Sequence, residues 1–425
     1  MSENLNRGRI AVAGVVMQLA LGAVYAWSVF RKPLTDEYDA SVSAVNTTFS
    51  ITILALGFAA FAGGLWMAKV GPRRVALTAG VLYGLGVFLA SFADAGLPVL
   101  YLTYGLLGGI GIGLGYIVPI ATLVKWFPDR RGFITGVAVA GFGGGALVTA
   151  PVARILVRDV GLFETFAILG VLYLVMVAGA AMFLKNPPEG WTPAGWSPPA
   201  EGADSGSGRS GIEFDLRGAL SRWQWYALWA ILFLNVTAGI AIISEAAPMA
   251  QEITGVSAVV AAGVVSIISI GNAVGRFLWA WLSDAIGRKN VFLVMYLAQA
   301  VLFVLLAQVS AYVLFAAIAF LIVSMYGGGF GTMPAFAADY FGARNVGKIY
   351  GLMLTAWGFG GVLGPLLISR VVDSTGGYET ALYILAGMLL VSSLLPLLIR
   401  PPGPASESGG REREAVAGAS QPARS

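Results

Sequence analysis

The sequence predicts an all-α membrane protein in which twelve transmembrane helices form two pseudo-symmetric six-helix bundles. Three observations support this prediction. Of the 425 residues, 57% are hydrophobic and only 11% are charged, a balance typical of chains that are solvated by lipid. Twelve apolar segments are each long enough to cross a bilayer. Short motifs that follow spans of the first half recur after the corresponding spans of the second half.

The twelve spans fall into two groups of six. Hydropathy places them near 9–30, 43–68, 75–95, 98–124, 132–155 and 163–184, and then near 222–248, 254–282, 290–308, 311–336, 347–370 and 378–399. A segment rich in Pro, Gly and Ser separates the groups, as is typical of a linker. We therefore expect a bundle at 1–184, a cytoplasmic linker at 185–221, a second bundle at 222–400 and a disordered cytoplasmic tail at 401–425.

The basic residues predict the orientation. Twenty of the 26 Lys and Arg residues lie on the side of the membrane that carries both termini, five lie on the other side, and Arg276 lies within a span. This split places both termini in the cytoplasm by the positive-inside rule. The first apolar run is too long for a signal peptide, so we expect it to be retained. We therefore predict a multi-pass protein that is located in the bacterial inner (plasma) membrane.

The composition excludes several kinds of chemistry. The chain has no Cys and no His, so disulfides, thiolate catalysis and the commonest general base and metal ligand are absent. We expect no metal and no cofactor. The scattered basic residues do not predict nucleic-acid binding. A membrane enzyme, such as an acyl or glycosyl transferase, is disfavoured because the sequence also has no extended soluble domain.

The two halves carry matching motifs. GGLWMAKVGPRR (63–74) follows the second span, and AWLSDAIGRKN (280–290) follows the eighth. The fourth and tenth spans are Gly-rich and end in KWFPDRRG and DYFGARNVG, and the fifth and eleventh spans carry GFGGG and WGFGG. Two six-span halves with matching loops are typical of transporters that rock about a central site. No ATP-binding motif is present, so the energy would come from a gradient.

These charged loops resemble the G-x-L-x-D-R-x-G-R-R motif of the major facilitator superfamily. The first copy has Ala68 where the motif has an acidic residue, and it keeps Arg73 and Arg74. The second copy keeps Asp284 and Arg288. The resemblance implies the fold of that superfamily and a gating role for these loops, in which the second copy carries the acidic contact.

Three further stretches resemble the oxalate/formate antiporter family, which is similar to the monocarboxylate transporters. They are YAWSVF (25–30), KWFPDRRG (125–132) and GRFLWAWLSDAIGR (275–288). The resemblance extends over nearly all of 9–399 and implies secondary transport of a small organic anion. Four aromatic residues and one methionine fall where the oxalate transporter has cavity aromatics and a lysine, respectively: Tyr25, Tyr350, Phe142, Phe330 and Met353.

Arg276 is the main candidate for the substrate site. It precedes Asp284, at the end of its span, by eight residues, which is about 12 Å of helix and close to the middle of a hydrocarbon core about 30 Å thick. A charge there costs at least about 2.5–3.5 kcal/mol, and Arg cannot lose its proton. The alternative is an arginine that caps carbonyls or pairs with a buried carboxylate. No Asp or Glu lies at the same depth in the sequence, which favours anion binding.

Other candidates lie on the spans that would line a central cavity, namely 1, 4, 7 and 10, with 5, 8 and 11 beside them. Asn272 is one helical turn from Arg276 and shares its face, where it could orient the guanidinium, donate to substrate or satisfy a neighbouring backbone. Tyr116 and Tyr326 stand beside Gly-rich segments of the fourth and tenth spans. Any one of these aromatic residues could instead serve packing.

The charge count predicts the substrate class. One guanidinium matches one carboxylate, whereas a dicarboxylate would favour a second cation. We therefore expect a small monocarboxylate such as lactate, pyruvate, formate or acetate. Glu245 is the carboxylate available for proton coupling, although it could simply be a wetted residue at the outer mouth. The leading hypothesis is a proton-coupled symporter that works as a monomer; the alternatives are an oxalate/formate-type exchanger and an anion sensor that does not transport.

Overall fold

The computed structural model describes residues 7–193, 195–196 and 210–403. The predicted disordered tail lies mostly beyond this range, because 404–425 are outside the described residues, and so are 194 and 197–209 of the predicted linker. The described residues contain twelve helical segments that are long and apolar enough to cross a membrane. The expectation of twelve spans is therefore confirmed.

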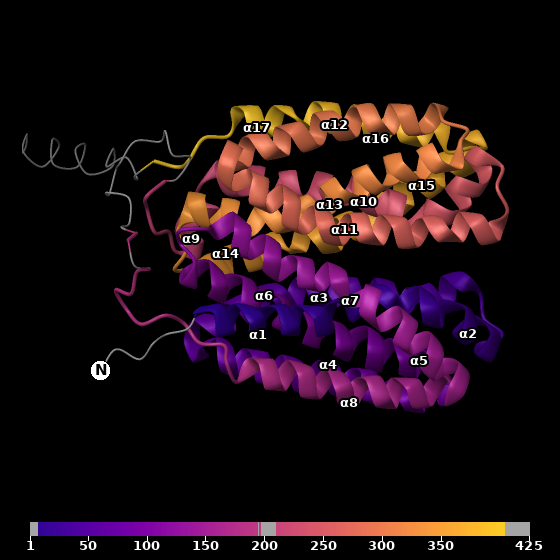
Figure 1. The fold of residues 1–425 in the computed structure, drawn as a ribbon, viewed down its shortest axis with the longest axis horizontal. Coiled ribbons are helices and arrows are strands. Elements are labelled where there is room, and N and C mark those ends of the chain that lie inside the picture. Colours follow the sequence, from indigo (N-terminus) through magenta and orange to yellow (C-terminus); the bar gives the residue numbers. More distant parts are fainter. Residues whose placement is uncertain (1–6, 194, 197–209, 404–425) are drawn as a thin grey trace, which may run out of the picture.

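The first half consists of the helices α1 (Arg7–Leu21), η1 (Gly22–Trp27), α2 (Ser28–Tyr38), α3 (Val42–Val70), α4 (Pro72–Leu89), η2 (Ala90–Ala95), α5 (Leu97–Leu100), η3 (Tyr101–Gly108), α6 (Gly109–Trp126), α7 (Arg131–Asp159) and α8 (Leu162–Ala181). The second half consists of α10 (Trp223–Thr254), α11 (Ala258–Ile286), α12 (Arg288–Gln308), α13 (Tyr312–Phe341), α14 (Val346–Met353), α15 (Thr355–Thr375), α16 (Glu379–Ser392) and α17 (Leu394–Leu398). Figure 1 shows the halves as two bundles lying side by side, with α9 (Leu216–Leu220) at one end.

Some boundaries differ from those predicted. The seventh span was expected to end at residue 248, but α10 continues through Pro248 to Thr254, because neighbouring helices allow membrane helices to tolerate proline. Several spans are divided into shorter helical segments, and two of them contribute to the site described below. The first passes through the 3-10 helix η1, which carries Tyr25, and the eleventh breaks at Leu354, between α14 and α15.

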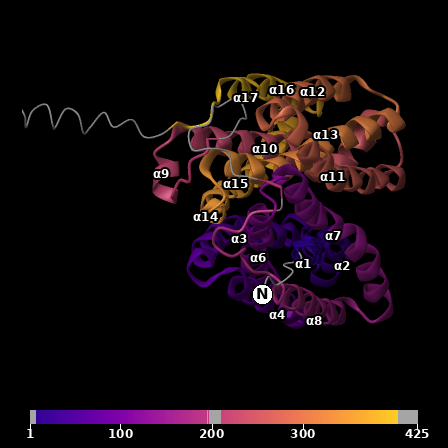
Figure 2. The same cartoon turned by 60° about the vertical axis from the view of Figure 1, so that its left-hand side comes forward.

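The interface between the bundles is formed mainly by α7 and α3 of the first half. Helix α7 packs against α11 and α13, and α3 packs against α14 and α15; a view turned by 60° shows α3 and α14 meeting across the boundary (Figure 2). Close approach requires glycine here: a Cβ on Gly64 of α3 would lie only 1.9 Å from the carbonyl oxygen of Gly347 on α14. These two contacts hold the bundles together around the site described below.

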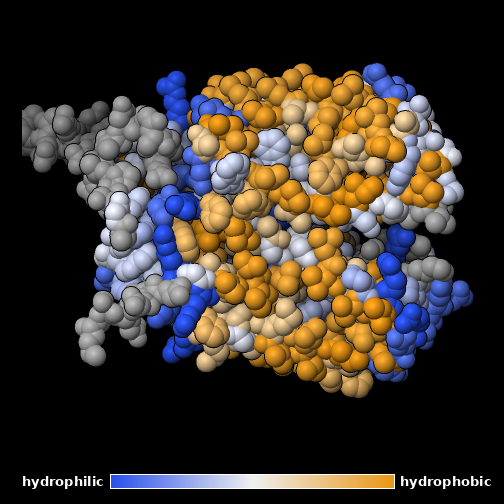
Figure 3. Space-filling view, in the orientation of Figure 1, coloured by the Kyte–Doolittle hydropathy of each residue, from blue (hydrophilic) through white to orange (hydrophobic). Residues whose placement is uncertain are grey.

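The surface matches a protein that is solvated by lipid. A broad belt of hydrophobic residues covers the long faces of the two bundles, and hydrophilic residues gather at the two ends (Figure 3). The start of α1, the linker and the end of α17 lie at the same end of the molecule (Figure 1), which we call the linker end. A notch separates the bundles at the opposite end (Figure 3).

Candidate functional site

Arg276 lies between the bundles and is fully buried, with 0% of its surface exposed. Helix α11 carries it, and α13 approaches its backbone so closely that a Cβ on Gly331 would lie 2.0 Å from the Arg276 carbonyl oxygen. From the other bundle, a Cβ on Gly143 of α7 would lie 3.1 Å from Cδ of Arg276. Small residues on both sides therefore let two helices enclose the arginine.

The guanidinium makes two hydrogen bonds to side chains. Its Nε donates to Oδ1 of Asn272 at 3.0 Å, and its Nη2 donates to the hydroxyl of Tyr25 at 3.3 Å. Of the roles considered for Asn272, the structure places its amide as the partner that orients the guanidinium. The third nitrogen, Nη1, is buried and has no hydrogen-bond partner within the described residues. An acceptor on a bound anion would complete it.

Three aromatic rings surround the charge. The guanidinium carbon Cζ lies 5.0 Å from the ring centre of Phe330, 5.5 Å from that of Phe142 and 5.9 Å from that of Tyr25. A desolvated cation–π contact contributes about 2 kcal/mol, so these contacts can offset the lower estimates, about 2.5–3.5 kcal/mol, of the cost of an arginine in a membrane. They supply no hydrogen-bond acceptor for Nη1. The rings make the charge tolerable and leave its binding capacity free.

The rings belong to an aromatic box formed by both bundles, in which Trp357 is central. Its ring centre lies 4.6 Å from that of Phe330, 5.5 Å from Tyr116, 5.8 Å from Phe142 and 6.4 Å from Tyr25. The box thus consists of Tyr25, Tyr116, Phe142, Phe330 and Trp357. From the sequence, Trp357 is visible only as the start of the WGFGG repeat. The GFGG that both motifs share aligns Phe142 with Phe359 rather than with Trp357, and Phe359 is exposed, so the repeat gives no signal for Trp357.

Two tyrosines predicted from the sequence lie at the same site. Tyr326 and Tyr350 are fully buried, and both lie within electrostatic range of Arg276. By hydrogen-bond geometry, their hydroxyls, that of Tyr116 and the indole nitrogen of Trp357 are unsatisfied within the described residues, although the phenols of Tyr116 and Tyr350 lie close to one another. The site therefore combines one cation with several unused donors. This arrangement can bind a small anion and excludes cations.

Buried amides hold the backbones of Tyr116 and Tyr326 in corresponding ways in the two bundles. Gln18 of α1 donates its amide to the carbonyl oxygen of Tyr116 at 3.1 Å, and Asn235 of α10 donates to the carbonyl oxygen of Tyr326 at 3.1 Å. Gln299 of α12 donates in turn to Oδ1 of Asn235 at 3.3 Å. The first and seventh spans thus support the fourth and tenth in the same manner. These amides were not among the residues predicted from the sequence.

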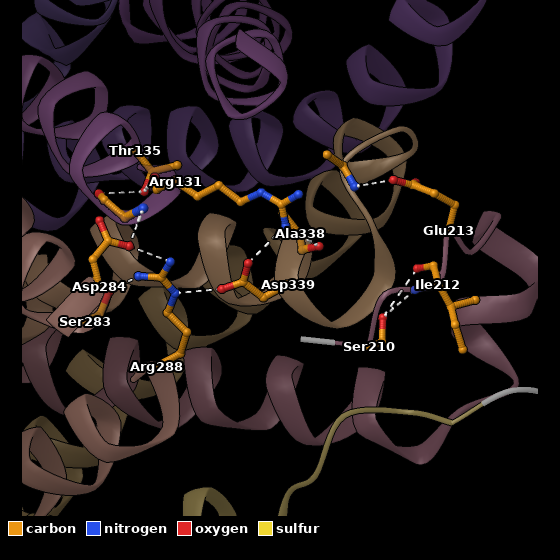
Figure 4. A network of polar contacts seen from close by, with 12 residues as sticks. Arg131, Thr135, Ser210, Ile212, Glu213, Ser283, Asp284, Arg288, Ala338 and Asp339 are labelled. Atoms are coloured by element: carbon orange, nitrogen blue, oxygen red, sulfur yellow. Dashed lines mark hydrogen bonds and ion pairs between the residues drawn. The ribbon is translucent and has the colours of Figure 1, made fainter. Parts of the chain in front are cut away.

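A second polar cluster, the linker-end network, joins the bundles between the site and the linker. The carboxylate of Asp284, which Figure 4 shows beside Arg288, accepts hydrogen bonds from the backbone N–H groups of Gly132 (3.0 Å) and Phe133 (2.7 Å). These groups begin α7, so an acidic residue of one bundle caps a helix of the other, where the helix dipole favours a negative charge. Thr135 adds a hydrogen bond from its hydroxyl to the carbonyl oxygen of Gly331 at 2.8 Å.

Asp339 extends the network between two arginines. Its Oδ1 accepts from Nη1 of Arg131 at 3.0 Å, across the boundary, and its Oδ2 accepts from Nε of Arg288 at 2.9 Å (Figure 4). Arg288 also pairs with Asp284 at 2.6 Å. Asp339 and Arg288 are only 5% and 6% exposed. Asp284 and Arg288 were predicted from the sequence to act here, whereas Asp339 and Arg131 are visible in the sequence only as parts of the repeats DYFGARNVG and KWFPDRRG.

The first copy of the charged loop makes different contacts. Arg73 and Arg74 are exposed, and Arg73 donates to the carbonyl oxygen of Met182 in its own bundle at 2.6 Å. At this side of the boundary the contact is the close approach of Gly64 and Gly347. The structure therefore does not bring Arg73 and Arg74 to the linker-end network, and their gating role stays a prediction.

The end of the linker packs against the same region. The carboxylate of Glu213 accepts from the backbone N–H groups of Ala343 (3.1 Å) and Arg344 (2.9 Å), just after α13. The backbone N–H of Phe214 donates to the carbonyl oxygen of Phe341 at 3.0 Å, and the two rings are in contact. Glu213 and Phe214 of the linker are thus held beside the network, as Figure 4 shows for Glu213.

No hydrogen bond or ring contact joins the two remaining candidates, Met353 and Glu245, to the guanidinium within the described residues. Met353 is fully buried at the end of α14. Glu245 is half-buried towards the notched end of α10, ten residues beyond Asn235, and accepts a hydrogen bond at 3.0 Å from the hydroxyl of Tyr378. Burial, and secondly the Glu245 carboxylate, raises the pKa of Tyr378, so the phenol remains protonated as the donor.

The fold and the sequence identify the family. A model of the Major Facilitator Superfamily matches residues 10–271 and 228–424. The chain belongs to the Major Facilitator Superfamily. The structure of the fucose:proton symporter FucP of Escherichia coli has the same fold, with a TM-score of 0.67 at 16% identity over 91% of this chain and 98% of that one. The chain is therefore an integral multi-pass membrane transporter of this superfamily.

Three relatives within the superfamily match this chain over most of its length. The uncharacterized MFS-type transporter YhjX of Escherichia coli (strain K12) is 32% identical over 354 residues, which cover 83% of this chain and 85% of that protein. The oxalate:formate antiporter of Oxalobacter formigenes is 26% identical over 398 residues, 92% of each chain. Monocarboxylate transporter 13 of Rattus norvegicus is 27% identical over 405 residues, which cover 93% of this chain and 89% of that protein.

Proposed function

We propose that this chain is a secondary active transporter of a small monocarboxylate anion, such as lactate or pyruvate, which binds to Arg276 in the aromatic box and crosses the membrane by alternating access. One observation carries the proposal: a fully buried guanidinium with a free Nη1 has no carboxylate partner within the described residues. A single carboxylate would neutralise the charge and supply the missing acceptor. The names of the oxalate and monocarboxylate relatives support this substrate class.

The proposal also covers the gate, the oligomeric state and the location of the protein. The linker-end network would act as the gate on one side of the site, and the bundles would rock around Arg276. The protein would act as a monomer in a bacterial inner membrane, with both termini cytoplasmic, and would not be an enzyme. Uptake of radiolabelled lactate into proteoliposomes, with and without an imposed pH gradient, tests transport and its coupling together. Binding without uptake would support the sensor alternative and contradict transport.

Exchange is a second candidate function, favoured by the missing counter-ion. When the site is empty, closing it would bury an arginine that has no anionic partner within the described residues, a cost that the surrounding rings offset only up to its lower estimates. A loaded site is neutral and closes more easily. An exchanger needs only loaded transitions, whereas a symporter must also return empty. Efflux of preloaded lactate that requires external lactate would support exchange, and equal efflux without it would support symport.

Glu245 is the residue that we propose for proton coupling in a symporter. Glu245→Gln removes the titratable group but keeps an acceptor for the hydroxyl of Tyr378, its partner at 3.0 Å. We expect the variant to keep lactate exchange and to lose accumulation driven by an acid-outside gradient. Measuring both in the same proteoliposomes separates the two outcomes. Gradient-driven accumulation that matches the wild type would show that Glu245 is not the proton carrier.

Met353 tests whether the number of cations selects the substrate. Met353→Lys adds a second charge on the buried face of α14, close in sequence to Tyr350 and Trp357. We expect competition by oxalate against labelled lactate to rise about tenfold or more relative to the wild type, because a dicarboxylate gains a second charge-assisted contact. An unchanged preference in a well-inserted protein would mean that cavity shape decides instead.

A further inference from the structure

We infer that the indole of Trp357 is a specificity-determining group that recognises an oxygen on C2 of the substrate, so that 2-oxo and 2-hydroxy acids are favoured over unsubstituted acids. The inference rests on the proposed function, because it assumes that the carboxylate binds to Arg276. It adds a second recognition point, on a different residue, for a different part of the ligand.

Trp357 lies against the same aromatic rings as Arg276. The guanidinium and the indole contact the same three rings, those of Tyr25, Phe142 and Phe330. Trp357 is itself fully buried. The two groups therefore pack around the same rings. On this arrangement, we expect a ligand of a few heavy atoms that binds one of them to lie beside the other.

Several buried polar groups around the site have no hydrogen-bond partner. Arg276 Nη1, Trp357 Nε1 and the hydroxyls of Tyr116, Tyr326 and Tyr350 all lack a hydrogen-bond partner within the described residues. A carboxylate offers about four acceptor positions, and the guanidinium uses two of them in a bidentate pair. Five buried groups thus lack a partner, and three of them are phenols, which can also accept a hydrogen bond. A ligand with a further oxygen fits the site better.

The indole of Trp357 differs from the phenols in its hydrogen-bonding capacity. A tyrosine hydroxyl can both donate and accept, so neighbouring phenols can satisfy one another. Tyr116 and Tyr350 are close enough to interact in this way, and so are Tyr25 and Tyr326. An indole N–H can only donate. Trp357 therefore needs an acceptor that the box does not supply, and the C2 oxygen is adjacent to the carboxylate held by Arg276.

The experiment compares two acids that differ at one atom position. Pyruvate carries an oxygen on C2, and 2-methylpropanoate has the same number of heavy atoms with a methyl group in that place. We expect the wild type to transport pyruvate with kcat/KM about tenfold higher or more, because a site with a buried donor rejects a ligand that leaves it unpaired. In Trp357→Phe, the ratio should fall towards one, through loss of pyruvate transport while 2-methylpropanoate transport is retained.

A matched control is available in the same bundle. Trp279→Phe also removes an indole N–H, which donates to Ser324 at 3.3 Å outside the box, and it should keep the wild-type ratio. Equal loss of both acids in Trp357→Phe would overturn the inference and indicate a packing role. Equal transport of the two acids by the wild type would overturn it without any variant. Transport of neither acid, by contrast, would count against the proposed function itself.

Discussion

Arg276→Lys is expected to lower the initial rate of lactate uptake at least tenfold while the protein still inserts and folds. Lysine keeps the charge but replaces a planar fork by a single ammonium group. That group cannot donate to Asn272 and Tyr25 as Nε and Nη2 do at 3.0 and 3.3 Å and still bind a carboxylate in a bidentate manner. Uptake into proteoliposomes, normalised to inserted protein, measures the loss.

The control and the stronger variant make this test decisive. Arg158→Lys alters an exposed arginine that pairs with Asp159 away from the site, so it should leave uptake unchanged. Arg276→Ala should abolish uptake, because the box then contains no cation. Wild-type uptake by Arg276→Ala would show that the substrate binds elsewhere.

Asp339→Asn is expected to open the linker end of the molecule. The variant removes the charge that pairs with both Arg131 and Arg288. Breaking a buried ion pair costs about 3–5 kcal/mol, and the contact to Arg131 exists only when the bundles are closed at this end. The closed arrangement should therefore lose most of its population to one in which the bundles separate here.

The native chain has no cysteine, which makes the measurement direct. Spin labels on cysteines introduced at Lys69 and Arg344, exposed residues at the linker end of opposite bundles, report the separation by pulsed electron paramagnetic resonance. We expect longer distances in Asp339→Asn. Asp159→Asn, which breaks the exposed pair with Arg158 within one bundle, should leave the distribution unchanged. The same distribution in Asp339→Asn and wild type would contradict a gating role for the network.

Several features of the fold and site could be predicted because they depend on local sequence. A span is visible as an apolar run, since every backbone group of a membrane helix is satisfied within the segment. Asn272 and Arg276 share a face by spacing alone, and the structure joins them. The predicted end of the seventh span was wrong. Pro248 suggests a helix terminus there, but α10 continues through it because neighbouring helices allow a membrane helix to tolerate proline. The interruptions at η1 and Leu354 carry no comparable signal in hydropathy.

The sequence by itself determined the number of spans, the two-bundle fold and the presence of one charge deep in the membrane. Only the tertiary structure decided what surrounds that charge. Trp357 lies 81 residues from Arg276 in the chain, and packing of the bundles brings it to the rings that the guanidinium contacts. Likewise, Asp339 could have paired with any of several basic residues near the linker, and its bonds to Arg131 and Arg288 follow from how α7, α12 and α13 meet. Hydropathy depends on each residue in turn, whereas these contacts depend on the distances between helices that are far apart in the sequence.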